Sequence, residues 1–268
     1  MPPYIFAALA LFLAISLPPA PEALAAGLGR LLIAGNGPEQ RMIQQLAAEF
    51  EKANPGTVVE IEWDRNLKAL EMVKAGHADL AVTGEEDPEL AATSIAWDGI
   101  AVIVNFSNPI QELTTQQVAG IFTGEITSWA EIGGPEAKID IIHRPPDRNI
   151  RAGFEQALGI AGKAVAAKTI RSDQKALSTV AGNLSAISYI SLGPSLEALQ
   201  FGIPIRALLI DGVEAAEPTV KTGQYPLRRP VFLVGEKDSN PAQAAFIAFA
   251  RSPKGQRIVD EIFVPYGP

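Results

Sequence analysis

The stretch that most constrains the fold runs from Ala96 to Trp129. It begins with an apolar run rich in β-branched residues, Ile100 to Val104, which is typical of a strand buried on both faces. A turn cluster follows at Ser107-Asn108-Pro109, and an amphipathic helix is expected over Gln116 to Phe122. Thr123-Gly124 ends that helix. The stretch therefore predicts a strand-to-helix connection of an α/β protein.

Strands and helices are expected to alternate along the rest of the chain. The spacing argues for βαβ units and a mostly parallel sheet. Asn66 is expected to cap the second helix, and Asn240-Pro241 to open the last one. The expected strands are Arg30 to Ala34, Val59 to Trp63, Ala78 to Val82, Ile139 to Ile142, Ala186 to Ser191 and Pro230 to Val234. The expected helices begin at about Glu39, Leu67, Ile150, Ala161 (to Thr169), Asp173 and Asn240.

No flexible linker interrupts the chain. We therefore expect two lobes joined by strands, with Ile100 to Val104 and Val231 to Val234 crossing from one lobe to the other. A cleft between such lobes closes around a ligand at the carboxyl ends of strands, close to helix N-termini.

Charge and cysteine content exclude several classes of protein. The net charge of -8 and the pI of about 4.9 argue against nucleic-acid binding. An acidic protein still binds an anion where helix N-termini and a few arginines set the local field. The absence of cysteine excludes disulfides and thiolate metal sites.

The N-terminal segment indicates export. Ile5 to Leu17 is the one long apolar run, and it is too short to span a bilayer comfortably. Pro18-Pro19 and a small-x-small pattern at Ala23-Leu24-Ala25 follow it. We expect a signal peptide over residues 1–25 and a periplasmic or secreted protein. A retained anchor stays open, because no Lys or Arg precedes the apolar run.

Two strings carry a resemblance to a known family. From Trp97 the chain reads WDGIAVIVN, then NP, LT and IFTG, and from Tyr225 it reads YPLRRP. This pattern resembles the PstS-like phosphate-binding proteins of bacterial ABC uptake systems. The similarity covers nearly all of the chain after the signal segment.

The resemblance implies a two-lobed periplasmic-binding-protein fold of the α/β class. Each lobe would be a mixed, mostly parallel sheet flanked by helices, and hinge strands would join the lobes. Lobe 1 would comprise residues 26–104 and 225–268, and lobe 2 residues 105–224. The implied function is capture of phosphate or a related small anion for an inner-membrane ABC permease, by a monomer without cofactor or catalytic activity.

In the family three helix-opening loops hold phosphate through backbone N–H groups, hydroxyls, an arginine and a carboxylate. Here most of the hydroxyls are absent. The first loop reads Gly35-Asn36-Gly37-Pro38, the second Asn66-Leu67-Lys68-Ala69, and the third runs from Arg144 to Arg151. The carboxylate position falls on Gly84, one residue before Glu85. The resemblance implies these ligand-binding residues: Asn36, Gly37, Asn66, Lys68, Glu85, Arg144, Arg148, Asn149 and Arg151.

Two alternatives stay open. The arginines could form ordinary pairs with Asp147, Glu155 or Glu85, and the protein could be a sensory or interaction module that no longer binds phosphate. Motifs for catalysis are missing: neither a Gly-x-Ser-x-Gly elbow nor a Gly-Lys-Ser/Thr phosphate loop occurs. His77 and His143 lack metal-ligand spacing, so no metal site is expected.

Overall fold

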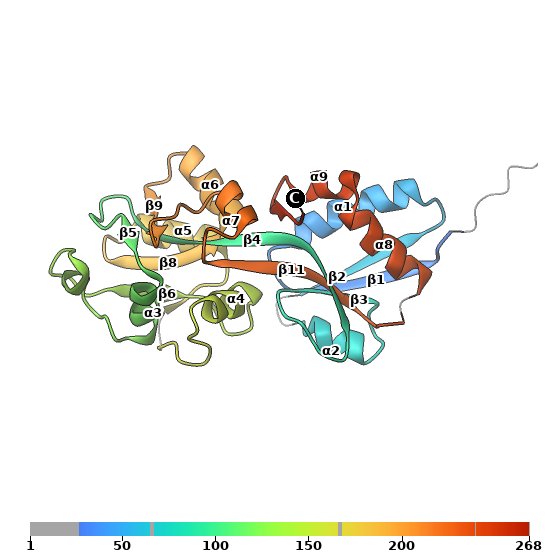
Figure 1. Cartoon of the computed structure of the whole chain (residues 1–268), viewed down its shortest axis with the longest axis horizontal. Coiled ribbons are helices and arrows are strands. Elements are labelled where there is room, and N and C mark those ends of the chain that lie inside the picture. Colours follow the sequence, from blue (N-terminus) through green and yellow to red (C-terminus); the bar gives the residue numbers. More distant parts are fainter. Residues whose placement is uncertain (1–26, 65–66, 166–167, 239, 268) are drawn as a thin grey trace, which may run out of the picture.

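The computed structural model describes residues 27–64, 67–165, 168–238 and 240–267. Two α/β lobes lie side by side, and the strands β4 (Ala91–Asn105) and β11 (Arg228–Gly235) run between them (Figure 1). The predicted signal peptide lies outside the described residues. Within those ranges, no helix combines the length and the apolar character needed to cross a membrane. The predicted two-lobed α/β fold is confirmed.

Lobe 1 is built on three parallel strands. β1 (Arg30–Gly35) lies between β2 (Val58–Trp63) and β3 (Leu80–Thr83). All four residues of β3 are buried, whereas exposed and half-buried positions alternate along the edge strand β2. Parallel strands need helical crossovers, and these crossovers cover the faces of the sheet.

Four helices pack on this sheet. α1 (Gln40–Ala53) follows β1, α2 (Ala69–Lys74) precedes β3, and the chain end adds α8 (Pro241–Arg251) and α9 (Pro253–Val259). The predicted cap at Asn240 is confirmed, because its side chain accepts a hydrogen bond from the Gln243 backbone N–H. The apolar face of α1 is buried as its spacing predicts, through Met42, Ile43, Leu46, Ala47 and Phe50.

The two crossing strands pair with each other in antiparallel register. Arg228 lies opposite Gly99, and Gly235 lies opposite Ala91. β11 also pairs with β3, and the short β12 (Val264–Pro265) pairs with β4, so the C-terminal strands complete the sheet of lobe 1. The predicted strand over 100–104 is too short. Polar residues in the first half of β4 hide the strand from a hydrophobic pattern, but pairing with β11 keeps that half extended.

Lobe 2 repeats the parallel arrangement on the other half of β4. β4 pairs antiparallel with β8 (Ala186–Ser191) and with β9 (Ile205–Ala207). β6 (Asp140–His143) lies parallel between β8 and β7 (Lys168–Thr169). The main sheet therefore runs continuously through both lobes in the order β2-β1-β3-β11-β4-β8-β6-β7.

The helices of lobe 2 follow its strands. α3 (Thr115–Thr123) begins with a capping box between Thr114 and Gln117 and ends at Gly124, which has a φ of 79°. The predicted stop at Gly124 is therefore confirmed. A separate parallel pair joins β5 (Glu112–Leu113) to β10 (Leu209–Ile210). The remaining helical segments are η1 (Trp129–Ile132), α4 (Asn149–Ala157), α5 (Asp173–Ala181), α6 (Leu192–Gln200) and α7 (Glu217–Thr222).

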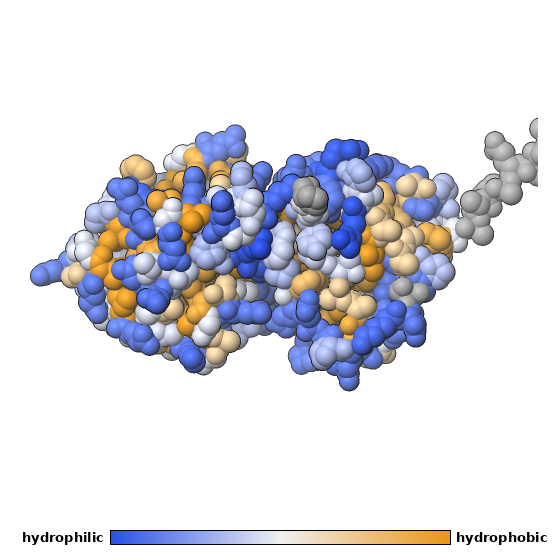
Figure 2. Space-filling model, in the orientation of Figure 1, coloured by the Kyte–Doolittle hydropathy of each residue, from blue (hydrophilic) through white to orange (hydrophobic). Residues whose placement is uncertain are grey.

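Two sets of buried residues divide the molecule. The buried residues up to Ala96 and those from Val231 onward pack in the cores of lobe 1, with the exception of Val264. The buried residues from Ile100 to Leu227 form the core of lobe 2, and Val264 packs with them. The chain thus passes from one core to the other within both crossing strands. Figure 2 shows hydrophilic residues gathered at the waist between the lobes on the face drawn.

One predicted helix is wrong and two helices were not predicted. Residues 160–165 are turns and coil, and Lys168–Thr169 forms strand β7 instead of the end of a helix. Gly159 and Gly162, at φ values of 67° and 70°, break the helical path on both sides of Ile160. α6 was hidden by Gly193 and Pro194, and α7 by Pro218; a helix tolerates proline in its first turn.

Candidate functional site

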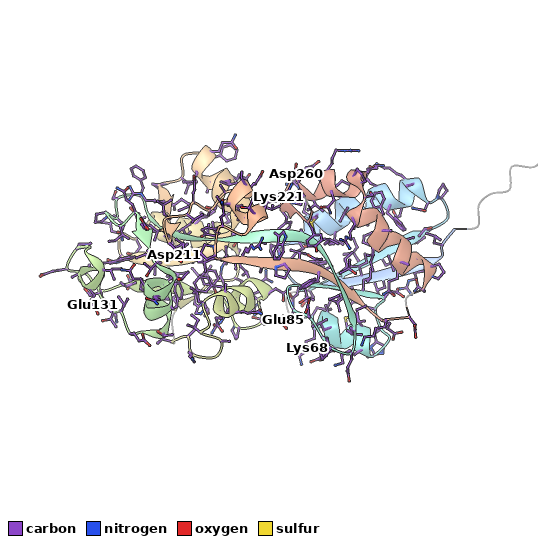
Figure 3. The ribbon with its side chains drawn as sticks, in the orientation of Figure 1. Lys68, Glu85, Glu131, Asp211, Lys221 and Asp260 are labelled. Atoms are coloured by element: carbon purple, nitrogen blue, oxygen red, sulfur yellow. The ribbon has the colours of Figure 1, made fainter. Side chains whose placement is uncertain are left out.

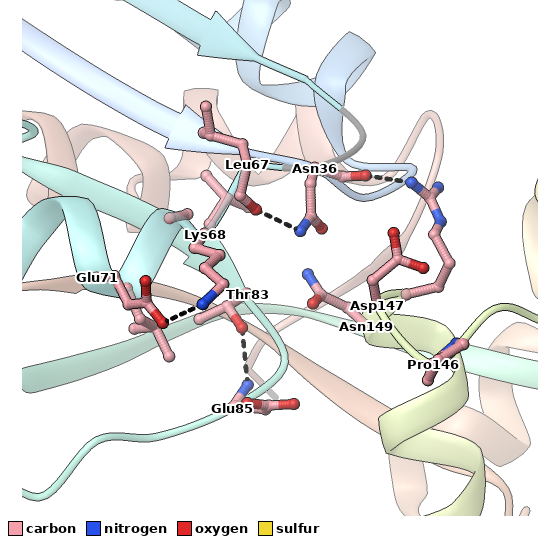
Figure 4. Close-up of a pocket in the computed structure, with 13 residues that line it drawn as sticks. Asn36, Leu67, Lys68, Glu71, Thr83, Glu85, Pro146, Asp147 and Asn149 are labelled. Carbon is pink, nitrogen blue, oxygen red and sulfur yellow. Dashed lines mark hydrogen bonds and ion pairs between the residues drawn. The ribbon is translucent and has the colours of Figure 1, made fainter.

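A cavity of about 400 Å³ opens between the two lobes. Lobe 1 contributes the loops after β1 and β3 and the start of α2, and lobe 2 contributes the segment that leads into α4 (Figure 4). The lining residues are Asn36, Leu67, Lys68, Ala69, Leu70, Glu71, Val82, Thr83, Glu85, Pro146, Asp147, Arg148 and Asn149.

Strand topology brings these loops together. β1 and β3 are parallel neighbours, so their carboxyl ends meet at one edge of the sheet, where Asn36 and Glu85 follow them. Across the cleft, β6 ends at His143 and the chain turns through prolines into α4. The first helical residue there is Asn149, and Arg148 is its N-cap.

Arg148 connects the lobes directly. Its Nη1 donates a hydrogen bond to the Asn36 backbone carbonyl, so a lobe 2 guanidinium contacts the first loop of lobe 1. Burial lowers the pKa of Arg148, and the charge of Glu39 opposes that effect. The Asn36 side chain donates to the Leu67 carbonyl at 2.8 Å. Its Oδ1 is buried without a partner among the described residues.

The other charges in the cavity are largely paired. Lys68 Nζ lies 2.8 Å from Glu71 Oε1, and Asp147 Oδ2 lies 2.8 Å from Arg171 Nη1. Glu85 is exposed on lobe 1 beside the waist (Figure 3), and its backbone N–H donates to Thr83 Oγ1. Among the residues that the structure describes, the lining contains two cationic side chains and three carboxylates. Its attraction for an anion must come from Arg148 and from backbone dipoles rather than from net charge.

Arg144 does not line the cavity. Its guanidinium is buried within lobe 2 and donates to the Tyr189 carbonyl at 3.3 Å, to the Ile170 carbonyl at 3.0 Å and to the Asp173 carboxylate. Burial lowers the pKa of Arg144 to about 10. Through its hydrogen bonds to these three acceptors, the guanidinium holds β6, β8 and α5 together.

Arg151 belongs to a network around His143. Arg151 Nε donates to Glu155 Oε1 at 2.6 Å, which is one of the pairs considered from the sequence, and its Nη1 donates to the Arg144 carbonyl at 2.9 Å. His143 Nε2 lies 3.3 Å from Glu155 Oε1, and its Nδ1 accepts from the Arg144 backbone N–H at 2.9 Å. The network fixes the backbone between β6 and α4, which positions Arg148.

Of the residues implied by the resemblance, the cavity brings together Asn36, Lys68, Glu85, Arg148 and Asn149. Gly37 is buried beside it, and its carbonyl accepts from Trp63 Nε1 at 3.1 Å. Asn66, with its predicted cap of α2, lies outside the described residues. Lys68 is the observed N-cap of α2, without a side-chain capping bond.

A buried ionic cluster next to the cavity was not predicted. Arg229 Nη2 lies 2.6 Å from Glu39 Oε1 and 2.8 Å from Asp98 Oδ2. Ser191 Oγ donates to the same Asp98 oxygen at 2.9 Å. Although burial lowers the pKa of Arg229, the two carboxylates outweigh it and raise that pKa. The signal in the sequence was the charged pair Arg228-Arg229 at the start of an otherwise apolar strand.

No group of metal-binding side chains occurs in the part of the chain that the structure describes. His143, the buried histidine, is surrounded by Phe122, Phe154 and Tyr189, and burial together with the charge of Arg151 lowers its pKa.

Comparison with known proteins gives one family match and a consistent set of relatives. A family model described as the PBP superfamily domain matches residues 20–254. The phosphate-binding protein PstS of Bacillus subtilis is 24% identical over 247 residues, which cover 88% of this chain and 81% of that protein.

Two solved structures share the fold and about a quarter of the sequence. An ABC-type phosphate transport receptor from Vibrio cholerae matches with a TM-score of 0.77 and 26% identity, over 89% of this chain and 100% of that one. A structure from Clostridium perfringens, named for a phosphate ABC transporter substrate-binding protein and holding bound phosphate, matches with a TM-score of 0.75 and 27% identity over the same shares.

Proposed function

The chain belongs to the PBP superfamily, and from this premise we propose that it is an exported solute-binding protein that captures phosphate or a related small anion. Capture would take place in the cleft between the lobes and would serve an ABC-type uptake system. The Vibrio and Clostridium relatives, named for phosphate transport, support this choice of ligand and system. Because the relatives are receptors, we propose no catalytic role.

The observation that carries the proposal is the cavity itself, because both lobes contribute to its wall. Arg148 and Asn149 come from lobe 2, and Asn36 comes from lobe 1. A ligand that contacts both sides stabilises the closed arrangement of the lobes more than the open one. Such a difference in population is what a permease needs to distinguish loaded from empty protein.

The start of α4 supplies suitable chemistry for an anion. The first N–H groups of a helix lack intrahelical acceptors and carry a partial positive charge. No side chain caps these groups in α4, because Arg148 is the N-cap residue and its guanidinium points toward Asn36. An oxyanion there would accept from backbone N–H groups, from the Asn149 amide and from the Arg148 guanidinium.

The test is ligand-dependent thermal stabilisation, followed by calorimetry. Phosphate, sulfate, molybdate and small carboxylates are titrated against the wild type and Arg148→Gln. We expect at least one of these anions to raise the Tm of the wild type and to lose most of that effect in Arg148→Gln. The matched control is Arg30→Gln, which removes an exposed arginine paired with Glu60 in lobe 1. If no anion shifts the wild-type Tm, the proposal is wrong.

Export and partnership are part of the same proposal. Residues 1–25 would act as a signal peptide, the mature protein would act as a monomer, and an inner-membrane ABC permease would receive the ligand. Fractionation of cells that express the full chain tests the location. N-terminal sequencing of the recovered protein tests cleavage after Ala25.

A second candidate function has an observation in its favour. The described lining of the cavity contains more carboxylates than cations, and the Arg144 guanidinium donates to acceptors inside lobe 2. A sensory or protein-interaction module that no longer binds phosphate would show this loss of free cationic groups. Neighbouring permease and ATPase genes would favour uptake, whereas a neighbouring histidine kinase gene would favour sensing.

A further inference from the structure

Glu39 has an unusual position for a residue that begins a helix. It is the N-cap of α1, yet its side chain makes no capping hydrogen bond and is completely buried. One carboxylate oxygen, Oε1, accepts from Arg229 Nη2 at 2.6 Å. The other, Oε2, is buried without a partner among the described residues. A buried carboxylate oxygen without a partner costs free energy, so its position calls for a functional explanation.

Gly37 makes room for this carboxylate. A Cβ atom on Gly37 would lie 1.9 Å from Glu39 Oε2, and no side chain fits at that distance. Gly37 is absent from the glycines with positive φ, so its backbone conformation does not demand glycine. The missing side chain at position 37 therefore serves the close approach of Glu39.

The carboxylate lies between positively charged groups that would also stabilise a bound oxyanion. The N-terminus of α1, a helix of 14 residues, lies on one side, and the Arg229 guanidinium lies on the other. Arg229 Nη1 is itself buried without a partner in the described structure. The charge of Glu39 also reaches Arg148 in the cavity wall, whose pKa it raises against the effect of burial.

We propose that Glu39 is a built-in counter-anion of the cleft, which takes the place of an oxyanion on the first loop and weakens the binding of anions. This inference rests on the proposed function and concerns the affinity of the same site. The carboxylate fills the space against Gly37 and neutralises the charge of Arg229. A ligand can therefore bind only on the α4 side of the cavity. A doubly charged anion is repelled more strongly than a singly charged one, because the repulsion scales with the product of the charges.

The experiment is calorimetric titration with phosphate and with sulfate in low-salt buffer. Glu39→Gln keeps an acceptor for Arg229 and the shape of the side chain while it removes the charge. We expect the Kd of this variant to fall by on the order of tenfold relative to the wild type, since one like charge is removed at short range. Glu60→Gln is the matched control, because it makes the same chemical change at an exposed position of lobe 1, and its Kd should stay at the wild-type value.

A second variant and a structure keep the test decisive. If Glu39→Gln does not fold, Glu39→Ala replaces it, with the same expectation for the Kd. Glu39→Ala also empties the space against Gly37, which the Gln side chain of Glu39→Gln still fills. A crystal structure of Glu39→Ala with sulfate should therefore show the anion beside Gly37 and Arg229. An anion found only at the start of α4 would overturn the proposed position.

The outcomes separate this inference from the proposed function. If the wild type binds phosphate and the folded Glu39 variants bind it equally or more weakly, the inference is wrong and the proposed function stands. If only the variants bind, the inference stands and anion capture by the native protein is wrong. If neither binds phosphate or sulfate, the inference is also wrong, because removal of the carboxylate should have freed a site.

Discussion

Arg229 and Asp98 lie directly opposite each other in the antiparallel register of the two crossing strands, with Arg229 Nη2 2.8 Å and Nε 3.1 Å from Asp98 Oδ2. Both side chains are 1% exposed. Ser191, at the end of the lobe 2 strand β8, donates to the same oxygen. A buried ion pair therefore sits at the point where the chain passes between the lobes.

Breaking this pair should destabilise the protein strongly. We expect Asp98→Ala to lower the free energy of unfolding by about 3–5 kcal/mol, because it removes one carboxylate from a buried guanidinium. Urea denaturation followed by circular dichroism measures the change. Glu60→Ala, which breaks the exposed pair with Arg30, is the control and should have little effect. Equal effects of the two substitutions would contradict a structural role for the buried pair.

His143 should make stability depend on pH. Burial, reinforced by the charge of Arg151, lowers its pKa from 6.5 to about 4 in the folded protein. Between these two values the unfolded chain binds a proton that the folded protein does not, so stability falls as pH decreases from about 6.5 to about 4. The integrated loss is roughly 2–3 kcal/mol. Above pH 6.5 this group has no further effect.

The two histidines of the chain provide a matched comparison for this prediction. Urea melts of the wild type, His143→Gln and His77→Gln are measured at pH 7.5, 6 and 5, because contributions from other groups cancel in the differences. The wild type and His77→Gln, whose altered residue is exposed, should lose stability in parallel. His143→Gln should start less stable but lose less on acidification. Identical slopes for all three proteins would show that His143 is not the titrating group.

Local patterns predicted much of the fold. The apolar spacing of α1, the cap at Asn240 and the stop at Gly124 all act within one or two turns of chain, and each was confirmed. The full length of β4 was not predictable in the same way. Its first half contains Thr93 and Ser94, and it is a strand because β11, more than 130 residues later in the chain, pairs with it.

The site was harder to predict because it depends on partners that are distant in sequence. Loop position indicated that Asn36, Glu85 and Arg148 would lie near one another, and one cavity contains all three. Whether an arginine faces that cavity depends on the acceptors around it. Arg144 finds them in Ile170, Tyr189 and Asp173, none of which a local motif identifies.

Helix α4 packs too closely on β11 to accept a larger residue at Gly153. A Cβ atom there would lie 2.8 Å from both Cβ and Cδ of Arg229. We expect Gly153→Val to cost about 1–3 kcal/mol of unfolding free energy, because the contact joins a lobe 2 helix to a crossing strand. Gln156→Ala, at an exposed position of the same helix, should be nearly neutral. A neutral Gly153→Val in urea denaturation would mean that the lobes separate readily at this contact.

Arg144 and Arg148, four residues apart, should respond differently to substitution. Arg144 donates to two backbone carbonyls and a carboxylate inside lobe 2, so Arg144→Ala leaves buried acceptors unpaired and should cost about 3 kcal/mol or more. Arg148 makes its hydrogen bond across the cleft to the Asn36 carbonyl, and Arg148→Gln should change the ligand-free Tm little. The response to anions should show the reverse order. Folded Arg144→Ala protein should retain a Tm shift with the anion that stabilises the wild type, whereas Arg148→Gln should lose most of it. If Arg144→Ala loses the shift while its Tm without ligand stays at the wild-type value, Arg144 contacts the ligand directly and its packing inside lobe 2 is not its main role.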